Sequence, residues 1–399
     1  MLFVVAGCAN GGAGTPAPDD GVVFADANFE KAIRDALNKP TGVITLADME
    51  SVTELRAYNY GIKSILEIEY CINLTYLYLD SNNISDISPL KELASLTYLN
   101  LGNNFISDIS ALGGLTSLTE LILYISIPSS IISENNISDI SPLKELTSLR
   151  SLNLFNQNIS DISPLSGLTS LTFLSLSNQN ISDISSLEDL ILLNSLYLYN
   201  NNISDISSLK GLTSLAELNL YNNSISDISP LKELTSLTYL NLSDNNISDI
   251  SPIEGLILLN NLSLYNNNIS DISSLKGLTS LDTLDLSDNS ISDISSLKGL
   301  ASLTELYIII NNISDISVLK ELTLLTSLWL NDNNIGDISP LKGLTSLTYL
   351  YLDRNNIRDI SALKELTALT HLNLGDNSIT DWSPVAHVKN VVGRPFPTN

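Results

Sequence analysis

Aromatic side chains recur at a spacing of 22 residues near the carboxyl end of the chain, as Tyr307, Trp329 and Tyr351. The chemistry open to such residues is non-covalent: stacking of flat surfaces, hydrogen bonds from hydroxyl and indole groups, and cation–π attraction. If the three residues occupy the same position in successive coils of a repeat, their rings lie about 4.8 Å apart and form a continuous platform. The spacing therefore predicts a binding surface.

Most other tyrosines share the same kind of position, on strand residues that face away from the expected core. Tyrosine is a good strand residue, which is the alternative explanation for their number. It does not explain why Phe155, Phe173 and Trp329 share these positions, so we expect contiguous exposed aromatics to form a ligand-binding face. The predicted groups are Tyr58, Tyr76, Tyr78 and Tyr98; Tyr197, Tyr199, Tyr221, Tyr239 and Tyr265; and Tyr307, Trp329, Tyr349 and Tyr351.

Residues for catalysis or metal binding are sparse. The two histidines, His371 and His387, lie sixteen residues apart, no cysteine stands at metal-ligand spacing from them, and no common nucleophile, phosphate-loop or zinc-protease motif occurs. Carboxylate pairs follow from the repeat and would need a cleft to shift their pKa values. The sequence predicts a non-catalytic protein with no cofactor and no metal site.

A repeat of 22 residues must position the aromatic side chains. Between Leu74 and Leu369 the pattern L-x-x-L-x-L-x-x-N-x-I-x-D-I begins fourteen times, and an irregular unit precedes it, giving about fifteen coils. Alternate leucines face one side of a short strand, and Ser-Pro or Ser-Ser steps favour a short helical turn on the far side. We expect an α/β repeat solenoid with a parallel β-sheet on its concave face and short 3₁₀ turns on its convex face.

Two polar positions recur in every unit. The first is an amide, Asn in most units and Gln157 and Gln179 in two, which can both donate and accept hydrogen bonds between stacked turns. The second is an aspartate four residues later, which we expect to cap the following turn by accepting a backbone N–H. The alternative is a ladder of calcium ligands, but the Gly-rich loop of such sites is missing.

The segment Asn82–Leu90, which reads N-N-I-S-D-I-S-P-L, resembles the internalin-type leucine-rich repeat of bacterial surface proteins. The resemblance covers about residues 23–393 and implies a leucine-rich-repeat solenoid that opens with a helical cap. The residues agree with this implication, because Phe29, Ile33 and Leu37 are spaced to lie on one helix face.

Cys8 ends the sequence Val4-Val5-Ala6-Gly7-Cys8, which is similar to a bacterial lipobox, where the cysteine becomes lipidated. A signal peptide needs a basic start and a longer apolar run than the seven residues before Cys8, so either the true start lies upstream or the match is due to chance. We therefore expect either a lipid-anchored protein of the bacterial cell surface or a secreted protein.

Nine residues interrupt one unit and predict a local bulge, after which the stack resumes at Asn135. Three interpretations of the insertion are open: it covers a neighbouring strand, it extends the binding face, or it is a duplication without function. The expected segments are 1–8, a truncated lipoprotein signal; 9–22, a flexible tether; 23–51, a helical cap; 52–390, the solenoid with its insertion near 125–133; and 391–399, a carboxyl-terminal tail.

Charge narrows the class of partner. The chain has 44 acidic and 19 basic residues and a formal net charge of −25, which argues against nucleic acid and against anionic membrane surfaces. We expect the protein to be attached to a membrane only through a lipid anchor. Acids interspersed among the aromatics suit a neutral or basic protein ligand, on a host or a neighbouring cell.

The expected function is bacterial surface recognition or adhesion through the concave face. A carbohydrate ligand is the alternative, because stacked aromatics beside Asp and Asn side chains also suit sugar rings. A structural spacer without a ligand is the second alternative.

Overall fold

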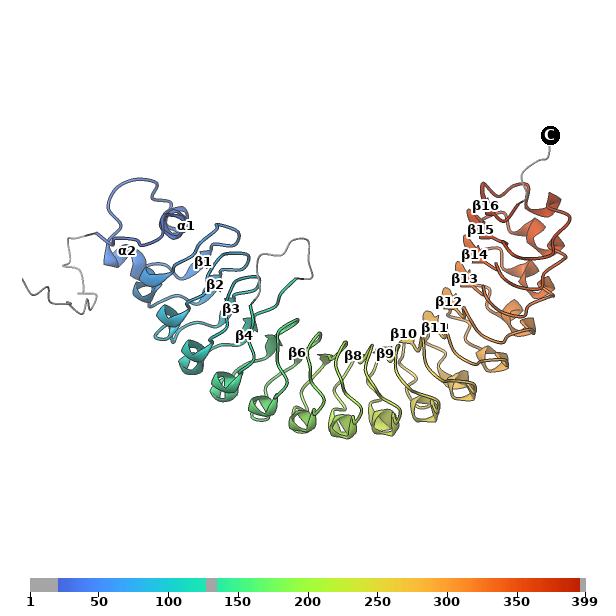
Figure 1. Cartoon of the computed structure of the whole chain (residues 1–399), viewed down its shortest axis with the longest axis horizontal. Helices are drawn as coiled ribbons and strands as arrows, with labels where there is room; N and C mark the ends of the chain where they lie inside the picture. Colours follow the sequence, from blue (N-terminus) through green and yellow to red (C-terminus); the bar gives the residue numbers. More distant parts are fainter. Residues whose placement is uncertain (1–20, 127–134, 395–399) are drawn as a thin grey trace, which may run out of the picture.

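In the computed structural model, the described residues, 21–126 and 135–394, form a horseshoe-shaped solenoid (Figure 1). Cys8, nearly all of the predicted tether and most of the predicted insertion lie outside the described residues, as does the end of the predicted tail. Asn135 takes part in the stack: the Ile106 N–H donates to Asn135 Oδ1 at 2.8 Å.

Two helices close the amino end of the solenoid. Helix α1 spans Ala27–Leu37 and begins after Asp26, whose Oδ1 accepts hydrogen bonds from two backbone N–H groups. Helix α2 spans Leu46–Glu50 and begins with a capping box between Thr45 and Asp48. The apolar face of α1 packs on the first coil, so the helix covers the end of the core as the cap prediction required.

A single parallel sheet of sixteen three-residue strands lines the concave face (Figure 1). Its strand order follows the chain, and neighbouring strands pair in the register of the repeat, as in Tyr307↔Trp329↔Tyr351. The strands are β1 Glu54–Arg56, β2 Tyr76–Tyr78, β3 Tyr98–Asn100, β4 Glu120–Ile122, β5 Ser151–Asn153, β6 Phe173–Ser175, β7 Ser195–Tyr197, β8 Glu217–Asn219, β9 Tyr239–Asn241, β10 Asn261–Ser263, β11 Thr283–Asp285, β12 Glu305–Tyr307, β13 Ser327–Trp329, β14 Tyr349–Tyr351, β15 His371–Asn373 and β16 Asn390–Val392.

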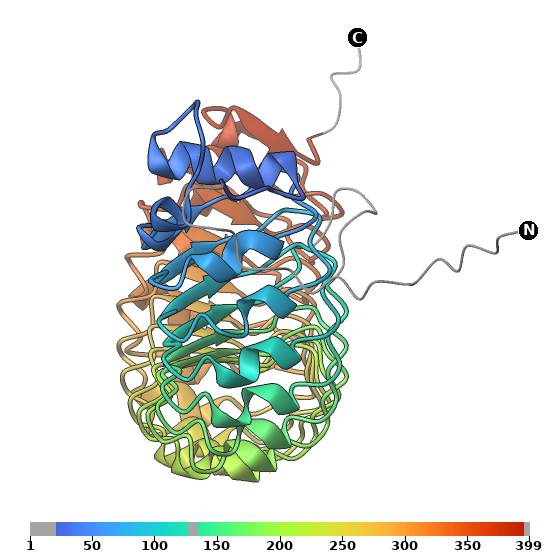
Figure 2. The ribbon, with the colours of Figure 1, turned by 90° about the vertical axis from the view of Figure 1, so that its left-hand side faces the viewer.

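Short 3₁₀ helices form the convex side, as predicted (Figures 1 and 2). They are η1 Leu66–Tyr70, η2 Ser88–Leu90, η3 Ser110–Gly114, η4 Ser141–Glu145, η5 Ser163–Leu165, η6 Ser185–Leu187, η7 Ser207–Gly211, η8 Ser229–Glu233, η9 Ser251–Ile253, η10 Ser273–Gly277, η11 Ser295–Leu297, η12 Ser317–Glu321, η13 Ser339–Gly343, η14 Ser361–Glu365 and η15 Ser383–Val385.

The core is a continuous stack of leucine and isoleucine between the sheet and the 3₁₀ helices. Cys71 is fully buried in this stack, in place of a leucine, and burial raises the pKa of its thiol to about 12. At the carboxyl end the sheet extends two residues past the predicted boundary, because Val391 and Val392 belong to β16 and pair with β15.

The two recurrent polar positions act as predicted. Asn245 shows the role of the amide: its Oδ1 accepts from the Ile225 N–H at 2.9 Å, and its Nδ2 donates to the carbonyls of Leu220 and Leu242 at 3.0 and 3.1 Å. Each of the fourteen aspartates accepts the backbone N–H of the serine two residues later at 2.8–2.9 Å. This bond lowers the pKa of carboxyls such as that of Asp227. The capping interpretation of the aspartates is thus confirmed.

Candidate binding face

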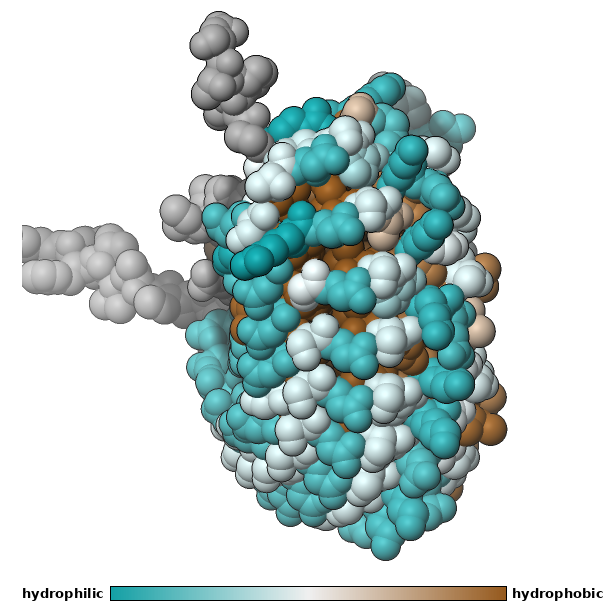
Figure 3. Space-filling model, turned by 90° about the vertical axis from the view of Figure 1, so that its right-hand side faces the viewer, coloured by the Kyte–Doolittle hydropathy of each residue, from teal (hydrophilic) through white to brown (hydrophobic). Residues whose placement is uncertain are grey.

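The concave and convex faces of the solenoid differ in the kinds of side chain that they expose. The convex side of the carboxyl-terminal arm carries mainly hydrophilic residues, with apolar residues visible between their rows and at one edge (Figure 3). On the concave side, the strand residues on either side of each buried central leucine point out of the sheet, and many of them are aromatic. The aromatic residues are therefore held by the most regular part of the fold.

Tyr307, Trp329 and Tyr351 form a continuous stack across β12, β13 and β14. The ring centroids of Tyr307 and Trp329 lie 5.6 Å apart, and those of Trp329 and Tyr351 lie 4.0 Å apart. The register of the repeat causes this alignment. The three side chains are half-buried rather than fully exposed, because each ring covers part of the next. The expected platform is present, but its three rings are less exposed than the sequence predicted.

A second row lies beside this stack. The Tyr349 ring stacks on the imidazole of His371, with a centroid distance of 4.8 Å and an interplanar angle of 16°. From the sequence, His371 was considered only as a candidate for catalysis or metal binding. Its position in the repeat, which matches that of Tyr349, was the signal that it belongs to the aromatic face.

Carboxylates surround the stack and lack full solvation. The Tyr307 hydroxyl donates to Glu305 Oε2 at 2.8 Å, and burial together with this bond raises the pKa of Tyr307 to about 12. Burial also raises the pKa values of Asp285 and Asp353. Among the described residues, Arg354 is a cation that lies beside these acids. The face is therefore acidic, with carboxylates that a basic ligand would stabilise.

Arg354 already bonds to two of these acids. Its guanidinium lies 3.0 Å from Asp332 Oδ1 and 3.5 Å from Asp353 Oδ2. Because the Arg354 side chain is largely exposed, these pairs contribute little to stability. A ligand cation could therefore compete for the same carboxylates.

The amino-terminal group of tyrosines is also packed ring against ring. Tyr98 contacts Tyr78 and Tyr76 at centroid distances of 4.5 and 6.3 Å. The Arg56 guanidinium lies 4.5 Å from the centre of the Tyr78 ring, so a cation of the protein itself occupies this aromatic surface. Tyr58 is 58% exposed.

The middle group does not form one continuous stack. Tyr197 contacts Phe173 at 5.7 Å, and Tyr199 contacts Phe155, two coils away, at 5.9 Å. Tyr239 and Tyr265 take no part in the ring contacts found within residues 21–126 and 135–394. The two phenylalanines are therefore part of this surface, although they were not among the predicted site residues.

Comparisons with known proteins agree with the repeat. A model of a leucine-rich repeat matches residues 72–124. A model of two leucine-rich-repeat copies matches residues 131–167, 147–191, 169–211, 191–233, 235–277, 279–321, 323–365 and 345–387. The solved structure of the internalin InlF from Listeria monocytogenes is 42% identical, covers 87% of this chain and 94% of its own, and has a TM-score of 0.71. The chain belongs to the internalin family of leucine-rich repeat proteins.

More distant structures share the fold of this internalin-family protein. A leucine-rich repeat protein of Leptospira interrogans is 22% identical, over 87% of this chain and 97% of its own, with a TM-score of 0.76. The functional domain of InlJ from Listeria monocytogenes is 23% identical, over 92% of this chain and 77% of its own, with a TM-score of 0.67, and it includes a cysteine ladder. In the present internalin-family chain, asparagines and aspartates form the ladders.

Proposed function

We propose that this internalin-family protein is a non-catalytic bacterial recognition protein that binds a neutral or basic protein ligand through its concave face. The observation that carries the proposal is the continuous stack of Tyr307, Trp329 and Tyr351, bordered by the carboxylates of Glu305 and Asp353. Adhesion to another cell is the purpose that this surface suits best.

The packing of the rings favours binding for two physical reasons. Each ring is already held by its neighbours, so little side-chain entropy is lost when a ligand covers the stack. The carboxylates beside the rings lie in poorly solvated places, so a lysine or arginine that approaches the stack gains both ionic and cation–π attraction. Aromatic anchors of this kind dominate the energies of protein interfaces.

The test is capture of ligand proteins from cell surfaces by the immobilised protein. Trp329→Ala should weaken capture by about 2 kcal/mol or more if Trp329 is a central anchor. Lys232→Ala, on the exposed flank of η8, is the matched control and should leave capture unchanged. Equal loss in both variants would show that capture does not use the concave face. Circular dichroism of each variant separates loss of binding from loss of folding.

We also propose that the protein is exported and either held at the bacterial surface by a lipid on Cys8 or secreted. Its support is the lipobox-like sequence Val5-Ala6-Gly7-Cys8. No helix in residues 21–126 or 135–394 is long and apolar enough to cross a membrane. With a complete signal peptide, the protein should take up labelled palmitate and partition into detergent, and Cys8→Ser should abolish both. Unchanged partitioning of the variant would contradict lipid anchoring.

A further inference from the structure

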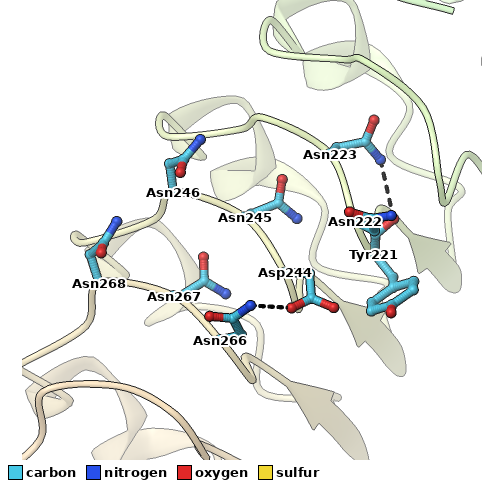
Figure 4. Close-up of a pocket in the computed structure, with 9 residues that line it drawn as sticks. All are labelled: Tyr221, Asn222, Asn223, Asp244, Asn245, Asn246, Asn266, Asn267 and Asn268. Atoms are coloured by element: carbon cyan, nitrogen blue, oxygen red, sulfur yellow. Dashed lines mark hydrogen bonds between the residues drawn. The ribbon is translucent and has the colours of Figure 1, made fainter. Parts of the chain in front are cut away.

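A shallow groove follows the edge of the solenoid, where the chain turns away from the sheet after β8, β9 and β10 (Figure 4). Its volume is about 510 Å³. Figure 4 shows its polar side chains in three rows along the stack, with the ring of Tyr221 at one end. The rows are Asn222, Asp244 and Asn266; Asn223, Asn245 and Asn267; and Asn246 and Asn268.

The first row is a side-chain ladder that breaks inside the groove. Asn222 Nδ2 donates to Asn200 Oδ1 at 2.8 Å, and Asn200 donates in turn to Asn178. Asp244 cannot continue the ladder, because a carboxylate accepts hydrogen bonds but has no proton to donate. Asn266 donates to Asp244 Oδ1 from the other side. The Tyr221 hydroxyl also bonds to Asp244, which raises the pKa of Tyr221. The oxygens of Asn222 and Asp244 are therefore consecutive acceptors, and a carboxylate has room for more than these two donors.

The other two rows differ in what they can offer a ligand. The middle row is the buried amide ladder, whose oxygens and nitrogens already bond to backbone groups, as in Asn267. Asn246 and Asn268 are exposed, and each presents a donor and an acceptor to solvent at the edge of the groove. The groove thus combines surplus acceptors, two amides at the spacing of the coils, and the face of Tyr221.

We propose that this groove binds a neutral saccharide chain. Sugar hydroxyls donate to acceptors such as Asn222 Oδ1 and Asp244, amides bond to hydroxyls in either direction, and the apolar face of a sugar ring packs on an aromatic side chain. The coils repeat at about 4.8 Å, which is comparable with the length of one sugar ring, so successive coils contact successive rings. Asp244 and the net charge of −25 disfavour an acidic glycan.

Saturation-transfer NMR and calorimetric titration with cellotetraose, maltotetraose and the tetramer of N-acetylglucosamine test the proposal. At least one of these probes should bind. Asp244→Asn supplies the missing donor and closes the ladder onto Asn222, so it should weaken binding roughly tenfold or more. The double variant Asn246→Ala with Asn268→Ala should do the same. Asp376→Asn, at the same turn position but far along the solenoid, is the control that should bind normally.

The outcomes separate this site from the concave face. Trp329→Ala should leave saccharide binding intact, and its loss in that variant would place the sugar on the aromatic stack and overturn the groove. Failure of all three probes at millimolar concentration would also overturn the proposal. So would groove variants that bind saccharide normally but lose capture of protein. Urea unfolding of each variant confirms that it is folded.

Discussion

The indole ring of Trp329 lies over the phenol ring of Tyr351, with centroids 4.0 Å apart and ring planes 22° apart. Its contact with Tyr307 on the other side is longer and more tilted, at 5.6 Å and 45°. The indole therefore contributes to the folded state through two ring contacts of unequal strength. It also supplies the central part of the surface that a ligand would meet.

Replacement of Trp329 by alanine should destabilise the fold modestly. Each of the two aromatic pairs contributes about 0.5–1.5 kcal/mol beyond area burial, so we expect a loss of about 1–3 kcal/mol in the free energy of unfolding, measured with urea. Tyr265→Ala, which removes a ring that is 38% exposed and unpaired among the described residues, should change it by less than about 0.5 kcal/mol. A large loss in both variants would argue against ring stacking as the cause.

Loss of one amide from the buried ladder should lower the free energy of unfolding far more than loss of the exposed amide next to it in the chain. In Asn245→Ala the Ile225 N–H loses its partner, and an unsatisfied buried group costs about 1–3 kcal/mol. The Leu220 and Leu242 carbonyls each lose one hydrogen bond, worth about 0.5–1.5 kcal/mol, but still accept from Asn223 and Asn267. We expect a loss of at least about 2 kcal/mol in thermal or urea unfolding. Asn246→Ala, at the adjacent exposed position, is the control and should have little effect. Similar losses would contradict the structural role of the ladder.

Asp285→Asn should stabilise the protein at neutral pH. Burial raises the pKa of Asp285, so its ionised form is disfavoured in the folded state, although the Ser287 N–H donates to its Oδ1 at 2.9 Å. A raised folded pKa favours folding below the unfolded pKa and opposes it as pH rises through the folded pKa. The gain in urea midpoint should therefore be present at pH 7 and vanish below about pH 4. A gain independent of pH would exclude ionisation as its cause.

Ile310 adopts a left-handed backbone conformation, with φ of 51°, that β-branched residues rarely tolerate. Asparagine or aspartate occupies this turn position in most other coils. Ile310→Asn should relieve the strain and raise the free energy of unfolding by about 1 kcal/mol. Ser81→Ile, at the equivalent turn with φ of 59°, should have the opposite effect. Chemical denaturation of both variants checks the pair, and a stabilising Ser81→Ile would refute the strain argument.

Much of the fold could be predicted from the sequence because the period alone determines which residues pair. Tyr307 must lie beside Trp329 once coils of equal length stack in register, and each repeated aspartate meets the same serine N–H. The cap could be predicted because Phe29 and Ile33 satisfy a helical spacing that differs from that of the repeat.

Features that depend on the curvature of the solenoid, or on side chains that differ between neighbouring coils, could not be predicted. The contact between Phe155 and Tyr199 joins alternate coils, which a single repeat position does not indicate. The half-burial of Trp329 depends on the rings on both sides of it. The break in the ladder at Asp244 becomes meaningful only when the hydrogen bonds of Asn222 and Asn266 are known.

The open horseshoe has a mechanical consequence. Within the described residues, each strand pairs with the strands of adjacent coils and with no others, so nothing braces one arm against the other (Figure 1). A rotation between coils that is too small to break any hydrogen bond adds up along the stack and widens or narrows the mouth. The solenoid can therefore bend elastically, and its mouth can adapt to ligands of different width without unfolding a single coil.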